Sequence, residues 1–195
     1  MAMLGKKHEF KPDRMESGPL HKLYITRKQR LKLLKWLMHA LVLLVVCLIQ
    51  DVLMSRLSFW GTTTDLVSCA ILIACIMQDP ETGCIYGLIT SSLYYCSGSA
   101  PDSYVIALLT GIGIVVSIFR QCYLRKGFGS TLICAAGAIM LYELAMFAIG
   151  AFVGQVPLSR LRVFCIKGAL SACAIPVLYP IFLSIGRIGG ESWKE

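Results

Sequence analysis

The chain has few charged residues. Lys, Arg, Asp and Glu make up 15% of its 195 residues, whereas hydrophobic residues make up 56%. Soluble domains carry about 25% charged residues, so the composition excludes an ordinary water-soluble domain and indicates a membrane protein. We expect an all-α, polytopic fold, because helices satisfy their own backbone hydrogen bonds in lipid.

The motifs of metal, nucleotide and nucleophilic chemistry are also missing. The nine cysteines form no CxxC pair, and the three histidines (His8, His21 and His39) lie far apart in the sequence. No phosphate-binding glycine loop occurs. We therefore expect no catalytic residue, no metal, no cofactor and no enzymatic activity. The cysteines, mostly within apolar stretches, are interpreted as small hydrophobic residues.

Six apolar stretches fill most of the chain between residues 33 and 186. They are Leu33–Leu53, Asp65–Met77, Gly83–Cys96, Tyr104–Phe119, Thr131–Val153 and Val163–Ile185. A straight span needs about 20 residues, so the second and third are short. We expect the second to borrow Phe59–Thr64 and the third to be tilted or partly re-entrant. The prediction is a bundle of about six transmembrane helices over residues 33–186.

The two ends of the chain are predicted to be cytoplasmic tails, residues 1–32 and 187–195. Ten of the 19 basic residues precede residue 36, which places that end inside by the positive-inside rule. The four basic residues then left outside are Arg56, Arg160, Arg162 and Lys167. We expect residues 1–32 to be mostly disordered, with a helical lead-in over Tyr24–Lys35.

The net charge of +8 comes mainly from the N-terminal tail. Anionic lipid is its expected partner, and nucleic acid is not. The alternative is that the tail only anchors the topology. Either way, the predicted location is the plasma membrane, with several spans.

Glu143 is the residue whose placement inside a membrane would cost the most free energy. It lies mid-stretch in Thr131–Val153, which holds no other charged residue. An Asp at such a depth costs about 2.5–3.5 kcal/mol on insertion scales. Glu143 is interpreted as a protonated or hydrogen-bonded carboxyl with a structural or partner-binding role; the alternative is transport or proton relay. Lys167 is the nearest basic candidate, but a direct pair is expected to stretch both side chains.

Asp65 begins the second apolar stretch and lies near the same outer boundary as Asp51, Arg56 and Lys167. We predict that Asp65 pairs with Arg56 or Lys167 and ties its helix to a neighbour. The alternative is that Asp65 only caps its own helix.

Small residues and prolines mark helix contacts. Gly83 and Gly87 form one GxxxG motif, and Gly150 and Gly154 form another. Such glycines allow close helix approach, either within this bundle or with a partner's helix. We predict that one of these glycine faces docks a partner's helix, and that Pro176 and Pro180 bend the last helix.

Four short motifs follow one another along the chain. They are Thr64-Asp65-Leu66, the pair Gly83 and Gly87, the Ser97-Gly98 turn, and Leu141-Tyr142-Glu143-Leu144. In type and spacing they resemble the rod shape-determining protein MreD family, over residues 33–186. Two positions depart from that pattern: Tyr94 stands where family members often carry Asp, and Thr64 where Pro is usual.

The resemblance implies a non-enzymatic membrane component of the bacterial cell-elongation machinery, which regulates cell shape. It implies a bitopic MreC-like membrane protein as direct partner. Peptidoglycan synthesis enzymes and an actin-like filament would be indirect partners. The implied fold is a compact bundle similar to the substrate-binding subunits of energy-coupling-factor transporters.

Such a transporter subunit is the alternative function. Those subunits carry an Ala-x-x-x-Ala motif in helix one, and Trp36–Leu44 lacks it. The predicted outer loops also lack a cluster of aromatic and polar residues suited to a vitamin. Both observations favour the cell-shape role.

Overall fold

The computed structural model describes residues 27–54, 56, 61–123, 127–154 and 156–187. Within these ranges the chain is all-helical, which confirms the all-α part of the prediction. The elements are α1 (Arg27–Ile49), the π-helical turn η2 (Gln50–Met54), α2 (Leu66–Met77), α3 (Pro80–Cys96), α4 (Val105–Tyr123), α5 (Phe128–Phe152), the 3-10 turn η3 (Leu158–Arg160), α6 (Leu161–Cys173) and α7 (Ile175–Gly186). The predicted helical lead-in is present from Arg27, whereas most of the predicted N-terminal tail lies outside the described residues.

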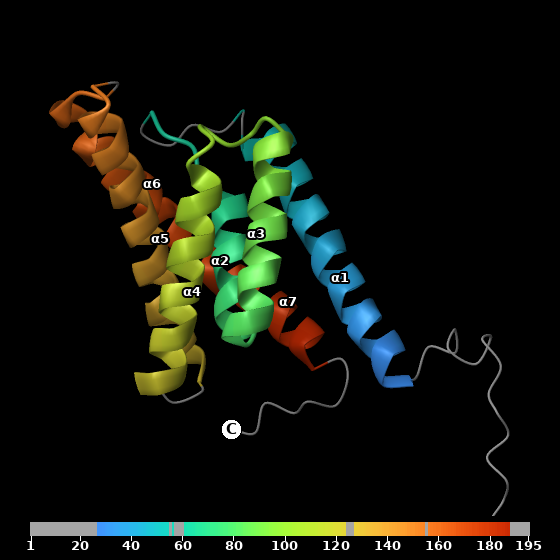
Figure 1. Ribbon diagram of the computed structural model, residues 1–195. Helices are drawn as coiled ribbons and strands as arrows, with labels where there is room; N and C mark the ends of the chain where they lie inside the picture. Colours follow the sequence, from blue (N-terminus) through green and yellow to red (C-terminus); the bar gives the residue numbers. More distant parts are fainter. Residues whose placement is uncertain (1–26, 55, 57–60, 124–126, 155, 188–195) are drawn as a thin grey trace, which may run out of the picture.

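Successive helices run in alternating directions, with α6 and α7 following each other in one direction (Figure 1). The start of α1, the turn between α2 and α3, the end of α4 and the end of α7 therefore lie at one end of the bundle, here called the base. The ends of α1, α3 and α5 and the start of α6 lie at the opposite, far end.

Helix α2 is the centre of the bundle. Its 12 residues are apolar except for Ser68, and all but Leu66 are buried. It contacts α1, α3, α4, α5, α6 and α7. Pro80 begins α3 only three residues after α2 ends, and its missing N–H and fixed φ favour a new helix start there. Because α2 is short and apolar and the chain turns back directly after it, α2 is the buried central helix against which the other helices pack.

The predicted extension of this helix over Phe59–Thr64 is wrong where the structure describes it. Residues 61–65 are not helical and run from the far end down to the start of α2 (Figure 1). Asp65 is the N-cap, and its side chain accepts a hydrogen bond from Ser68 N–H. Capping therefore fixes the start of α2, which is only about 18 Å long at 1.5 Å per residue.

Glycines hold α3 and α4 close against α2, around Cys75. A Cβ atom at Gly83 would lie 3.0 Å from the Cys75 carbonyl oxygen, and one at Gly87 would lie 3.0 Å from Cys75 Sγ. From α4, a Cβ at Gly113 would lie 3.1 Å from Cys75 Cβ. Gly83 and Gly87 thus serve packing within this chain, where α2 covers this face of α3, and docking of a partner's helix stays a prediction.

The last apolar stretch forms two helices with a bend of 46° between them. The break lies at Ala174, and Pro176 stands in the first turn of α7. Proline lacks an N–H, so α7 cannot continue the hydrogen-bond ladder of α6 unchanged. The predicted bend is therefore confirmed beside Pro176, whereas Pro180 lies inside the continuous helix α7.

Three helical segments are long and apolar enough to cross a membrane: Gln29–Val52, Val105–Cys122 and Phe128–Phe152. The bent pair α6 and α7 adds a fourth if it forms one span. By length and composition the described part of the chain therefore supports a membrane protein with three or four long spans. The predicted number of six also requires the shorter α2 and α3 to count as spans.

Candidate functional site

Asp65, at the start of α2, is surrounded by hydrogen-bond donors. Its carboxylate accepts from Ser68 N–H at 3.0 Å and from the Ser68 hydroxyl at 2.8 Å. The Tyr94 hydroxyl of α3 lies 3.4 Å from both carboxylate oxygens. The Asp65 N–H itself donates to Ser171 Oγ of α6 at 2.9 Å. Asp65 therefore joins three helices as well as capping one.

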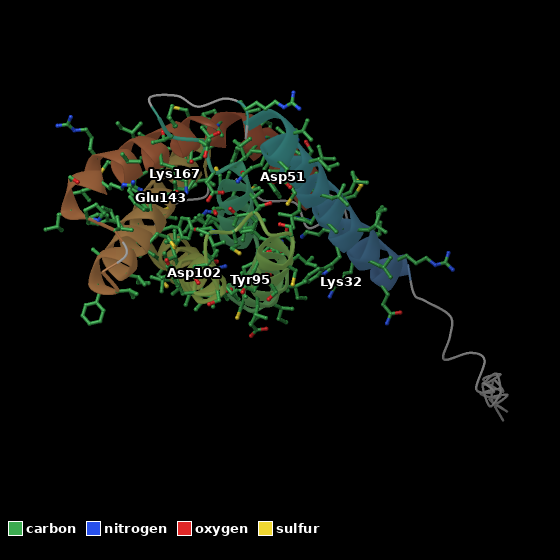
Figure 2. All side chains as sticks on the ribbon, turned by 90° about the horizontal axis from the view of Figure 1, so that it is seen from above. Lys32, Asp51, Tyr95, Asp102, Glu143 and Lys167 are labelled. Atoms are coloured by element: carbon green, nitrogen blue, oxygen red, sulfur yellow. The ribbon has the colours of Figure 1, made fainter. Side chains whose placement is uncertain are left out.

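Lys167 of α6 links Asp65 to Glu143 of α5. Its Nζ lies 2.9 Å from Glu143 Oε1 and 3.6 Å from Asp65 Oδ2. The Lys167 side chain is 23% exposed, whereas those of Glu143 and Asp65 are 1% and 3% exposed. Viewed along the bundle, Glu143 and Lys167 lie beside each other (Figure 2). We call Asp65, Glu143 and Lys167 the ionic cluster.

The close packing of α5 and α6 places Lys167 in this position. A Cβ atom at the adjacent Gly168 would lie 2.7 Å from Met140 Sδ and 3.6 Å from Glu143 Cγ. Because Gly168 has no side chain, the backbone of α6 approaches α5 at the level of Glu143. At this distance between the helices, the side chain of Lys167, which precedes Gly168, is long enough to reach both carboxylates.

The predicted pairing of Asp65 with Lys167 is confirmed. The expectation that a Glu143–Lys167 pair would stretch both side chains is wrong. Helix α6 begins at Leu161, so Lys167 lies about 9 Å into the helix, and Glu143 lies about 13.5 Å from the end of α5 at Phe152. The difference in depth is shorter than a lysine side chain.

Two tyrosines and two serines complete the polar surroundings of the cluster. Tyr142 is fully buried and neighbours Glu143 in sequence. Ser171 accepts from the Asp65 N–H, and its carbonyl oxygen lies 3.6 Å from Cys69 Sγ. The sequence singled out Tyr94 only as a departure from the MreD pattern. Its place near the far end of α3, level with the start of the antiparallel α2, is the signal that predicts its contact with Asp65.

The opposite end of α2 is held by a basic residue that belongs to none of the sequence motifs. Arg120 of α4 is buried, and its guanidinium donates to the Ile76 carbonyl oxygen at 2.5 Å. The Ser117 hydroxyl, one turn earlier, donates to the Gln78 carbonyl oxygen at 3.4 Å. A positive charge at a helix C-terminus satisfies unpaired carbonyl groups and opposes the helix dipole. Charged side chains therefore hold both ends of α2.

The second GxxxG pair does not form one open face. A Cβ atom at Gly150 would lie 2.8 Å from Val156 Cγ2, so the following loop covers this glycine. Gly154 adopts a φ of 77°, a left-handed conformation that suits a helix C-terminus. Val156 covers Gly150, and Gly154 ends the helix, so the structure gives these two glycines roles within the chain; docking of a partner's helix on them stays a prediction.

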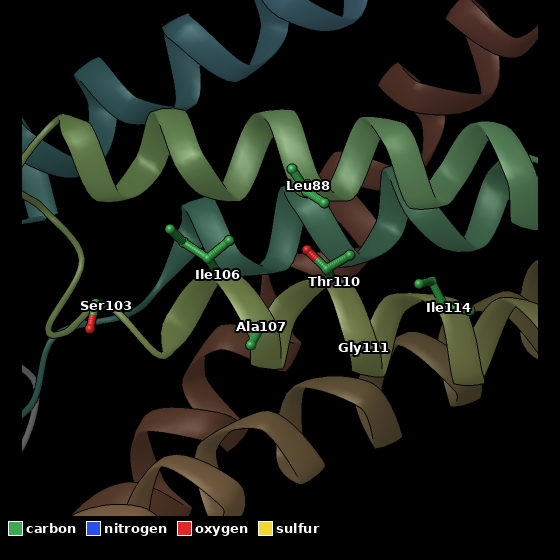
Figure 3. Close-up of a pocket in the computed structure, with 7 residues that line it drawn as sticks. All are labelled: Leu88, Ser103, Ile106, Ala107, Thr110, Gly111 and Ile114. Atoms are coloured by element: carbon green, nitrogen blue, oxygen red, sulfur yellow. The ribbon is translucent and has the colours of Figure 1, made fainter.

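A shallow groove of about 500 Å³ lies between α3 and α4 (Figure 3). Its lining is mostly apolar: Leu88, Ser103, Ile106, Ala107, Thr110, Gly111 and Ile114. Nothing lies within 4 Å of the position of a Cβ atom at Gly111. Unlike Gly83 and Gly113, Gly111 is thus open to the surroundings of the bundle.

The other acidic residue predicted near the outer boundary is exposed. Asp51, on η2, accepts a hydrogen bond from the Ser99 hydroxyl at 2.7 Å. It thereby joins η2 to the loop after α3 and lies apart from the ionic cluster.

The cluster has charged and hydrogen-bonding groups but no arrangement of a metal centre. No group of three or more His, Cys, Asp or Glu side chains is placed to share a metal ion within the described ranges. The side chains present can hold helices together, hold charge and bind a proton. No family model, curated protein or solved structure matches this chain.

Proposed function

We propose that this protein is a non-enzymatic membrane component of the bacterial cell-elongation machinery. One observation carries the proposal. Two of the motifs that resemble the MreD family, Thr64-Asp65-Leu66 and Leu141-Tyr142-Glu143-Leu144, lie far apart in sequence, and their carboxyl groups share Lys167. Residues that meet at one buried site depend on each other, so the motifs describe one structural core rather than separate chance matches.

The short connections between the described helices support a scaffolding role. Only two residues connect α2 to α3, and the connection from α3 to α4 spans residues 97–104. A chain of this kind acts through helix faces and short loops. Its proposed direct partner is a bitopic MreC-like protein, with peptidoglycan synthesis enzymes and the actin-like filament engaged indirectly.

The proposed topology has six spans, with α2 and α3 as short spans and α6 and α7 as one bent span. Basic residues gather toward the base: Arg30, Lys32, Lys35, Arg120 and Arg187 belong to the start of α1 or the ends of α4 and α7. By the positive-inside rule the base faces the cytoplasm, with the N-terminal tail on anionic lipid.

The native cysteines test this topology. Cys96 ends α3 at the far end and Cys122 lies in the last turn of α4 at the base, and both are exposed. A membrane-impermeant maleimide applied to whole cells should label Cys96 and spare Cys122. Single substitutions, Cys96→Ser and Cys122→Ser, identify the labelled site. Labelling of Cys122 alone would mean that the protein has the opposite orientation in the membrane.

Co-purification tests the function itself. The protein extracted in mild detergent should bring down a bitopic membrane protein with a periplasmic coiled coil, and its deletion should turn rods into spheres. A tightly bound small molecule together with ATPase subunits would instead establish the transporter alternative. Rod shape that persists without the protein would refute the cell-shape role.

The groove between α3 and α4 is the surface at which we test partner binding, because Gly111 there leaves room for a close helix. Gly111→Leu should weaken co-purification of the bitopic partner and leave the protein's abundance unchanged. Gly137→Leu on α5 is the matched control, since nothing lies within 4 Å of that Cβ position either. Equal effects of the two variants would place the partner elsewhere.

A further inference from the structure

The ionic cluster contains one more acidic group than basic groups. If Asp65, Glu143 and Lys167 were all ionised, the cluster would carry a net charge of −1. Both carboxyl side chains are almost completely buried, at 3% and 1% exposure. An uncompensated charge in such surroundings is strongly unfavourable, so one more positive charge belongs to this site.

Among the residues that the structure describes, the remaining titratable groups near the cluster do not supply that charge. The groups around the cluster on the elements packed against it include Cys47 of α1, Cys69 of α2, Tyr94 of α3 and Tyr142 of α5. Thiol and phenol groups are neutral when protonated and become negative when they ionise. None of them can balance a second carboxylate.

The hydrogen-bond donors show which carboxyl group is the anion. Asp65 receives the Ser68 N–H and hydroxyl and the Tyr94 hydroxyl, and it caps the positive end of the α2 dipole. Glu143 has only Lys167, at Oε1, and no donor among the described residues reaches its buried Oε2. The surrounding donors therefore stabilise a negative charge on Asp65, whereas a negative charge on Glu143 would have only Lys167.

We propose that Glu143 is a proton-binding site. One proton on Oε2 makes the cluster neutral, with Asp65 negative, Lys167 positive and Oε1 of the neutral acid facing the ammonium group. A neutral hydroxyl without a partner is less costly than an unpaired charge. The 23% exposure of the Lys167 side chain opens one side of the cluster, so the proton can exchange.

The proton controls how firmly α5 and α6 hold α2. With Glu143 protonated, Lys167 is shared between one anion and one neutral acid. Loss of the proton leaves two carboxylates competing for one ammonium group, and their repulsion acts between α5 and the start of α2. Occupancy of this site is therefore linked to the attachment of the α5–α6 pair to the central helix.

Infrared spectroscopy of the purified full-length protein detects the proton directly. A protonated carboxyl group in dry surroundings has a C=O stretching band separate from the amide and carboxylate bands. We expect this band at neutral pH in the wild type, a shift of it in D₂O, and its loss in Glu143→Gln. Glu81→Gln, which changes an exposed glutamate of α3, should leave the band unchanged.

Stability against pH gives a second, independent measurement. At pH values at which a solvated glutamate is ionised, Glu143 keeps its proton in the folded protein, which therefore binds one proton more than the unfolded protein. Stability must then fall as the pH rises. Glu143→Gln should remove this slope, because glutamine imitates the protonated acid at every pH.

Three results would overturn the proposal. The first is absence of the band in the wild type at neutral pH. The second is loss of the band in Asp65→Asn with retention in Glu143→Gln, which would assign the proton to Asp65. The third is stabilisation by sodium ions without the band, which would assign a metal cation to the site. If Glu143→Gln does not accumulate, titration of the wild-type band together with wild-type stability decides the question.

Discussion

Replacing Lys167 with methionine tests whether the ionic cluster holds the bundle together. Methionine keeps most of the length and the apolar stem of lysine and removes only the charged group. The variant leaves the Asp65 carboxylate buried without the ammonium group 3.6 Å away, and leaves Glu143 without its contact at 2.9 Å. We expect folding to weaken through the uncompensated negative charge.

The structure sets the size of this effect. Removing one partner of a buried ion pair costs about 3–5 kcal/mol. Because Lys167 is 23% exposed, water screens part of its interaction, and we expect a loss near the lower end. A loss of about 3 kcal/mol changes the unfolding equilibrium about a hundredfold.

Reversible unfolding in mixed micelles, with increasing SDS and detection by circular dichroism, measures this loss. Lys32→Met, on the exposed side of α1, is the control and should change stability by less than about 0.5 kcal/mol. Adding Asp65→Asn to Lys167→Met should restore about 2 kcal/mol, since Asn still caps the helix and carries no charge. A Lys167→Met variant as stable as the control would refute the inference that the cluster holds α2, α5 and α6 together.

Two further predictions concern the other contacts of α2. Gly83→Ala would place a Cβ atom 3.0 Å from a backbone oxygen of α2, so it should lower stability by about 1–3 kcal/mol, whereas Gly111→Ala should be neutral or stabilising. Equal stability of these two variants would contradict the tight packing of α3 on α2. Arg120→Met should cost about 1–3 kcal/mol, because the Ile76 carbonyl oxygen loses its donor. In the same assay the exposed Arg162→Met should have no effect, and an unaffected Arg120→Met would mean that water replaces the guanidinium.

A contact between two residues was predictable from the sequence where only a few side chains had the charge or the geometry to make it. Few basic residues lie near the outer boundary, so the tie between Asp65 and Lys167 followed from charge and approximate depth. The bend near Pro176 followed from a missing N–H. In both cases one local property of a side chain decides the structure.

The depth of a residue within the bundle, and the helix against which a glycine packs, were less predictable from the sequence. Counting residues from assumed helix ends placed Lys167 too far from Glu143, because the sequence does not show how closely Gly168 brings α6 to α5. Likewise, GxxxG spacing indicates close approach but not to which helix. In the structure Gly83 and Gly87 of α3 pack against α2, and Val156, after α5, covers Gly150.

The shortness of α2 explains why costly charges occur in this bundle at all. A helix of about 18 Å ends inside the bundle, because Asp65 at its start and Met77 at its end are both buried. Each helix end leaves backbone groups without partners inside the helix, and these need partners from the protein. Gln50, Asp65 and Ser171 bind N–H groups at the start of α2, and Arg120 binds a carbonyl group at its end. Once Asp65 is required there, Lys167 is required to neutralise it, and this lysine also contacts Glu143.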